Sequence, residues 1–148
     1  MLDLSKLMVE TKEVWVDYPD VEGFRVKVAN ISRTELKKLR DRTTNKSYDR
    51  KTRAMVESLD EELFVKEFTE ATLKGWEGLT LEILETLILI NTEGHDMKEE
   101  FLFNSSNSVL LVTHSSEFDI WLNEVVFDLD NFRTGAKRSG DGETGDSV

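Results

Sequence analysis

Two short runs near the amino-terminal end alternate strictly between apolar and polar residues, and this alternation constrains the fold more than any other feature. The runs cover residues 13–18 and 24–29, and Gly23 lies in the short connection between them. Alternation at every second residue is typical of a strand with one buried face, and glycine can supply the positive φ of a turn. We expect an antiparallel hairpin in which Tyr18 faces Phe24, so that both apolar sets share one face.

Helix-start signals divide much of the remaining chain into amphipathic helices. Residues 32–35 form a capping box, which predicts a helix that runs to about Thr43. Asp60 precedes aromatic residues at helical spacing, and Gly75 and Gly78 are expected to end that helix. Three further helices are expected: one capped by Thr80, one over residues 105–114, and one that starts at the capping box 116–119. The last carries a stripe of Phe118, Trp121, Leu122, Val125, Leu129 and Phe132.

The order of these elements predicts an α+β fold. Residues 45–59 are expected to form a second, shorter hairpin, and residues 91–103 a loop. We therefore predict a small antiparallel sheet of hairpins at the amino-terminal side, with a carboxy-terminal set of about four packed helices. A single domain should cover residues 1–133. Residues 134–148 are rich in glycine and polar side chains, and we expect them to form a disordered tail.

Charge and composition exclude several classes of protein. The chain has 148 residues, no cysteine and a formal net charge of −11, so disulfides and thiolate zinc sites are impossible. Its charge would repel nucleic acid and anionic membranes. The amino-terminal residues do not resemble a secretory signal, and the longest apolar run, 87–90, is far below the roughly 20 residues of a membrane span. We expect a soluble cytoplasmic protein.

An acidic protein can also imitate nucleic acid, but that function requires carboxylates arrayed on one continuous face. Here the acidic residues are interspersed with lysine and arginine, and residues 33–53 are locally basic. Inhibition by nucleic-acid mimicry therefore stays a minor alternative.

No motif in the sequence supports catalysis or cofactor binding. Residues 140–145 spell G-x-G-x-x-G, but the acidic residues between these glycines would repel a phosphate. Residues 128–131 begin like a calcium loop, yet Phe132 and Arg133 occupy the next two positions, which need an oxygen ligand and a glycine. A divalent ion beside His95 is conceivable because acidic residues flank it, although a solvated loop is the favoured interpretation. We expect no enzyme activity, no cofactor and no metal.

Three apolar residues lie on faces that the predicted fold does not need to bury, and they are the candidate partner-binding residues. Ile120 and Phe127 are seven residues apart, and at about 100° per residue they lie together, opposite the main stripe of their helix. Trp15 lies on the polar face of the first hairpin, opposite Lys27. Each has two open interpretations. They either pack within the monomer or form a surface for a partner or another copy of the chain.

Several segments, taken in order, resemble the tail assembly chaperones of long-tailed bacteriophages. They are YPDVEGFRVKV (18–28), ISRTEL (31–36), YDRKTR (48–53), GWEGLT (75–80), FDIWL (118–122) and DNFR (130–133). The resemblance covers residues 14–133 and rests on the order and spacing of these short pieces, because none carries a chemical signature.

This resemblance implies a non-catalytic function in the host cell cytoplasm. Such chaperones bind the long, mostly helical tape measure protein before tail tube protein subunits polymerise around it, and they are not expected in the mature virion. Many exist as a short form and a frameshift-extended form, and this chain is similar to the short form. Possible self-association is a further expectation. The alternative is a structural tail or connector component of the virion.

Overall fold

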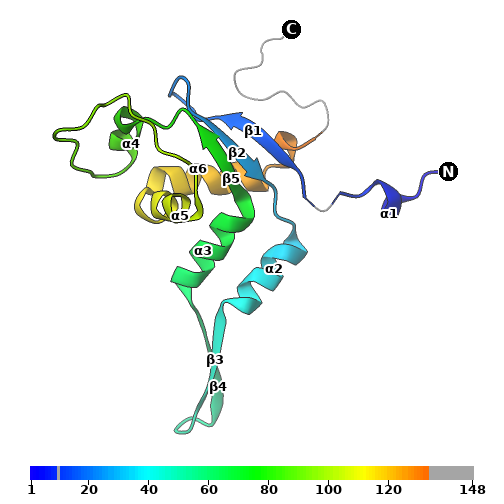
Figure 1. The fold of residues 1–148 in the computed structure, drawn as a ribbon. Coiled ribbons are helices and arrows are strands. Elements are labelled where there is room, and N and C mark those ends of the chain that lie inside the picture. Colours follow the sequence, from blue (N-terminus) through cyan, green and yellow to red (C-terminus); the bar gives the residue numbers. More distant parts are fainter. Residues whose placement is uncertain (10, 134–148) are drawn as a thin grey trace.

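The computed structural model describes residues 1–9 and 11–133, and it has an α+β fold, as predicted (Figure 1). Its main sheet has three antiparallel strands: β1 (Glu13–Asp17), β2 (Arg25–Ala29) and β5 (Leu73–Glu77), in the order β1-β2-β5. The predicted register of the first hairpin is confirmed, because Trp15 pairs with Lys27 and Asp17 pairs with Arg25.

Strand β5 was not predicted, because its residues were expected at the end of a helix. That helix, α3 (Glu61–Thr72), ends immediately before the strand. The buried side chain of Trp76 faces Val26 across the sheet, and its Nε1 donates a hydrogen bond to the carbonyl of Phe101 at 2.9 Å. Gly75 therefore lies in a strand, and only Gly78 lies in the turn that follows it.

The remaining helices begin at side-chain caps. They are α1 (Leu4–Leu7), α2 (Arg33–Arg42), α4 (Leu81–Leu87), α5 (Ser105–His114) and α6 (Ser116–Phe127), followed by a 3₁₀ turn at Leu129–Asn131. The predicted caps Ser32, Asp60 and Thr80 are confirmed. The cap of α6 was placed one residue too late. Ser115 accepts the hydrogen bond from the Phe118 amide at 3.1 Å, and Ser116 is the first helical residue.

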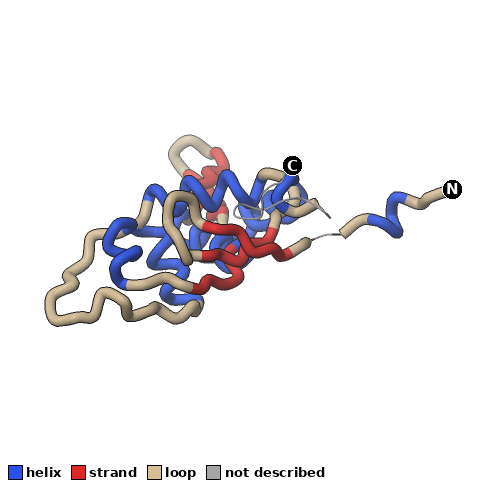
Figure 2. The backbone as a smooth tube through the Cα atoms, turned by 90° about the horizontal axis from the view of Figure 1, so that it is seen from above, coloured by secondary structure: helices blue, strands red, loops and turns tan. Residues whose placement is uncertain are grey.

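The core lies between the sheet and the carboxy-terminal helices, which gather on one side of the strands when the molecule is seen from above (Figure 2). Tyr18 and Phe24, which flank the first turn, pack against Phe118 and Trp121 of α6. Ring centroids lie 5.8 Å apart for Tyr18 and Phe118, and 4.9 Å apart for Tyr18 and Trp121. Such aromatic contacts add to the free energy gained from burial alone. The cluster fastens the amino-terminal hairpin to the last long helix.

The hydroxyl of Tyr18 also forms a hydrogen bond across this contact. It donates to Glu117 Oε2 at 2.6 Å. Burial raises the pKa of the Tyr18 hydroxyl above its ordinary value and is the largest cause. This hydrogen bond and the negative charge of Glu117 raise the pKa further. The neutral phenol therefore acts as a donor that holds α6 against the turn between β1 and β2.

The predicted apolar stripe is wrong at one residue, Leu129. Leu129 is 69% exposed, whereas Phe132 is buried. Helix α6 ends at Phe127, and the 3₁₀ turn changes the residue spacing, so that helical periodicity no longer applies. The predicted tail over 134–148, with its glycine motif, lies outside the described residues.

The second predicted hairpin exists, but it is not the shorter one. Strands β3 (Thr44–Asp49) and β4 (Ala54–Leu59) have six residues each, against five in β1 and β2. They form a separate two-stranded sheet, which projects from the ends of α2 and α3 away from the body (Figure 1). Its base is closed by a hydrogen bond of 2.7 Å from the Asp60 amide to the Thr43 carbonyl.

Glycine at position 78 should be essential for stability, whereas glycine at position 75 should not. Gly78 has a φ of +77°, and a Cβ there would lie 1.9 Å from the carbonyl oxygen of Gly23. At Gly75, the nearest atom to an added Cβ is 3.5 Å away. We predict that Gly78→Ala lowers the free energy of unfolding by at least about 2 kcal/mol. Gly75→Ala should change it by less than about 1 kcal/mol. Urea unfolding of both variants tests this, and equal losses would contradict it.

Candidate functional site

The two predicted residues of α6 are both exposed, but they have different neighbours. Ile120 is 59% exposed and lines an open depression with Pro19 and Val21 of the first turn. Phe127 is 50% exposed, and its ring centroid lies 6.1 Å from that of Phe68 in α3. Phe127 therefore packs partly within the monomer, whereas Ile120 is mainly available to solvent.

The depression beside Ile120 is acidic at its edges. Asp20, Glu117 and Glu124 line it, and its volume is 600 Å³. On the same helix, burial raises the pKa of the Asp119 carboxyl, and a hydrogen bond of 3.1 Å from Asn123 Nδ2 opposes that shift. The outer side of α6 therefore combines apolar side chains with a concentration of carboxylates.

Trp15 lies on the opposite face of the sheet from α6. It is half-buried, the guanidinium carbon of Arg25 lies 5.5 Å from its ring centroid, and its ring reaches over Gly75 of β5. Arg25 also pairs with Asp17 at 3.1 Å and with Glu77 at 3.3 Å. Trp15 thus packs across a polar sheet face within the monomer, and the structure does not bring it together with Ile120 or Phe127.

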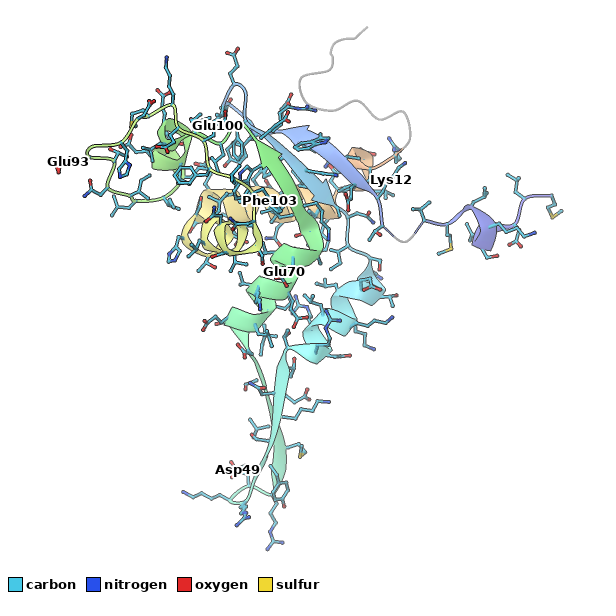
Figure 3. All side chains as sticks on the ribbon, viewed as in Figure 1. Lys12, Asp49, Glu70, Glu93, Glu100 and Phe103 are labelled. Carbon is cyan, nitrogen blue, oxygen red and sulfur yellow. The ribbon has the colours of Figure 1, made fainter. Side chains whose placement is uncertain are left out.

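The β3–β4 hairpin is an exposed surface that was not included among the predicted binding residues. Tyr48 and Met55 pair across the strands, and they are 58% and 61% exposed; Val56 is 45% exposed. Side chains stand out on both sides of this hairpin, and Asp49 marks its far end (Figure 3). An isolated two-stranded hairpin is marginally stable in water. A protein that keeps one with apolar side chains on it presents a surface suited to docking.

The hairpin also belongs to the most basic part of the chain. Residues 33–53 hold nine of the 19 basic residues and three of the 30 acidic residues. Within this segment, Arg42 pairs with Glu67 at 2.8 Å, and Lys38 lies 4.0 Å from Glu35. Four hairpin cations make no ion pair with any described residue: Lys46, Arg50, Lys51 and Arg53. A local basic run beside Tyr48, Met55 and Val56 was the sequence signal that could have identified this surface.

The amino-terminal segment is a second exposed apolar element. Residues 1–9 include α1, extend away from the body and bury no side chain (Figure 1). Leu4 is 72% exposed, Leu7 59% and Met8 67%.

A groove between α4, the loop over 91–103 and α5, here called the α4–α5 groove, is an apolar hollow of the body. Its floor is a pocket of 150 Å³ that contains Trp76, Leu84 and Phe101. A wider outer part of 550 Å³ adjoins the floor and includes His95, Glu99 and Glu100. In the described residues, no three histidine or acidic side chains gather closely enough to hold a metal ion.

Comparisons with known proteins add no assignment. No family model, curated protein or solved structure matches the chain. Across residues 1–9 and 11–133, no helix is both long enough and apolar enough to cross a membrane.

The structure predicts different stability effects at the three sequence-predicted residues. Ile120→Ser should change the free energy of unfolding by less than about 0.5 kcal/mol, because the side chain is mostly exposed. Trp15→Ser and Phe127→Ser should each cost about 1 to 2 kcal/mol, because their rings contact Arg25 and Phe68. Urea unfolding measures all three. A loss above about 2 kcal/mol for Ile120→Ser would make it a core residue.

Proposed function

We propose that this chain is a non-catalytic binding protein that acts as a tail assembly chaperone of a long-tailed phage. In this function it binds the tape measure protein in the host cytoplasm and keeps it soluble until tail tube subunits polymerise around it. The observation that supports binding most strongly is the β3–β4 hairpin, which exposes Tyr48, Met55 and Val56 on a projecting element. The resemblance of residues 14–133 to such chaperones supplies the identity of the client.

The charge of the body suits such a function. A long helical protein with unpaired apolar stripes aggregates when nothing covers them. A partner that covers these stripes with exposed apolar side chains, and that carries a net charge of −11, would keep the complex in solution.

Release of the chaperone sets an upper limit on the strength of this contact. The tube subunits must displace the chaperone, so its interface should be of moderate size and partly hydrated rather than an obligate one. The hairpin fits this requirement, because its apolar residues are few and lie among polar and charged side chains. We therefore expect the chaperone to be absent from the finished particle. A frameshift-extended form of the same protein would share this surface.

Co-expression with tape measure fragments tests this function. We predict that the wild-type chain keeps the fragments soluble and co-purifies with them. The double variant Met55→Ser, Val56→Ser should lower the recovered fragment at least about tenfold, because it removes two of the exposed apolar side chains of the hairpin without touching the core. Leu129→Ser is the matched control, since Leu129 is 69% exposed and lies outside the hairpin.

Two outcomes would contradict the proposal. If the chain and its hairpin variant recover equal amounts of fragment, the hairpin is not the client surface. If washed, mature particles contain the chain in stoichiometric amounts, a structural tail component is the better assignment.

A further inference from the structure

The α4–α5 groove can accept an apolar side chain from outside the molecule. Its floor of 150 Å³ is lined by Trp76, Leu84, Phe101, Leu110 and Leu111, together with Asn107. An apolar cavity of about 150 Å³ is large enough for a benzene-sized group. The amide nitrogen of Asn107 already donates to the Leu102 carbonyl at 3.0 Å, so the remaining wall is apolar in character.

The rim of this groove is acidic. Glu99 and Glu100 line its outer part, and both are exposed. The loop over 91–103 holds four acidic residues and one lysine, and none of these carboxylates forms an ion pair with a described residue. Its preferred occupant is therefore an apolar group flanked by cations.

The β3–β4 hairpin has this chemistry. The paired side chains of Tyr48 and Met55 supply the apolar group, and the turn beyond them supplies Arg50, Lys51 and Arg53. The turn is locally fixed, because Asp49 Oδ1 accepts a hydrogen bond of 2.8 Å from the Lys51 amide. The backbone of the turn thus places the three basic residues just beyond the apolar pair.

The hairpin does not lie near the groove of its own molecule. Asp49 marks the far end of the hairpin, whereas Glu93 and Glu100 lie on the loop at another end of the molecule (Figure 3). The base of the hairpin is held by the hydrogen bond between Asp60 and Thr43 and by the ion pair between Arg42 and Glu67. Contact with the groove therefore requires a second copy.

We propose that the hairpin of one copy docks in the α4–α5 groove of another. Tyr48 or Met55 enters the apolar floor, and the basic turn faces Glu99 and Glu100. The two surfaces are different, so the contact is head-to-tail, and its repetition gives a ring or an open chain. One consequence rests on the proposed function: this contact covers the client-binding side chains of the hairpin until the client competes for them.

Cysteine cross-linking tests the pairing without background, because the chain contains no cysteine. Equal amounts of Met55→Cys and Leu110→Cys are mixed in the absence of client, oxidised and separated on a non-reducing gel. We expect heterodimers to exceed either homodimer at least fivefold, and the variant that carries both cysteines to give a ladder of higher oligomers. Met55→Cys mixed with Leu129→Cys is the control and should give no such excess.

Charge reversal provides a second, independent measurement by sedimentation. The variant Arg50→Glu, Lys51→Glu, Arg53→Glu and the variant Glu99→Lys, Glu100→Lys should each be monomeric. Because a head-to-tail contact uses two different surfaces, a mixture of the two variants should regain association through the reversed charges. Added salt should weaken the wild-type association. Thermal melting must show that both variants remain folded.

Three results would overturn the proposal. They are a monomeric wild-type chain at all attainable concentrations, equal cross-linking of Met55→Cys to the groove and control positions, and preferential cross-linking of Leu4→Cys to Leu110→Cys. The last would assign the groove to the amino-terminal segment. All three leave client binding untouched, since the client is absent.

Discussion

The contact between the first turn and α6 holds the two ends of the fold together. Tyr18 and Phe24 flank that turn, and Phe118 and Trp121 pack against them from the other end of the sequence. The Tyr18 hydroxyl adds a hydrogen bond of 2.6 Å to Glu117. This cluster closes the core over one face of the sheet, in a chain that contains no cysteine and therefore no disulfide.

Among the described residues, the β3–β4 hairpin and residues 1–9 both lie outside the core and carry exposed apolar side chains. The hairpin also lies in a basic part of an otherwise acidic chain. Apolar contact favours association with many partners, whereas charge selects among them and fixes orientation. The division between a basic projection and an acidic body would therefore let charge select what the hairpin contacts, including the proposed client and the proposed second copy.

Local sequence signals predicted most of the architecture. They failed where contacts between residues far apart in sequence determine the local structure. The hairpin register followed from alternation and charge, and the cap at Ser32 followed from its spacing to Glu35. Residues 73–77 became a strand because β2 offers a free edge, which no local pattern reveals. Of the predicted binding residues, Ile120 is exposed, but the partial packing of Phe127 depends on α3, far away in sequence. The basic run at 33–53 was a local signal for the hairpin surface, but the exposure of Tyr48, Met55 and Val56 depends on how the rest of the fold packs.

Hydrogen exchange tests most directly whether the hairpin is the docking surface for a client. Backbone amides of Thr44–Asp49 and Ala54–Leu59 would be followed with and without a bound tape measure fragment, at a concentration at which the chain is monomeric. The account predicts that exchange in these strands slows at least about tenfold on binding, because a covered hairpin opens less often. Protection confined to α6 or to the outer sheet face around Trp15, with an unchanged hairpin, would contradict it.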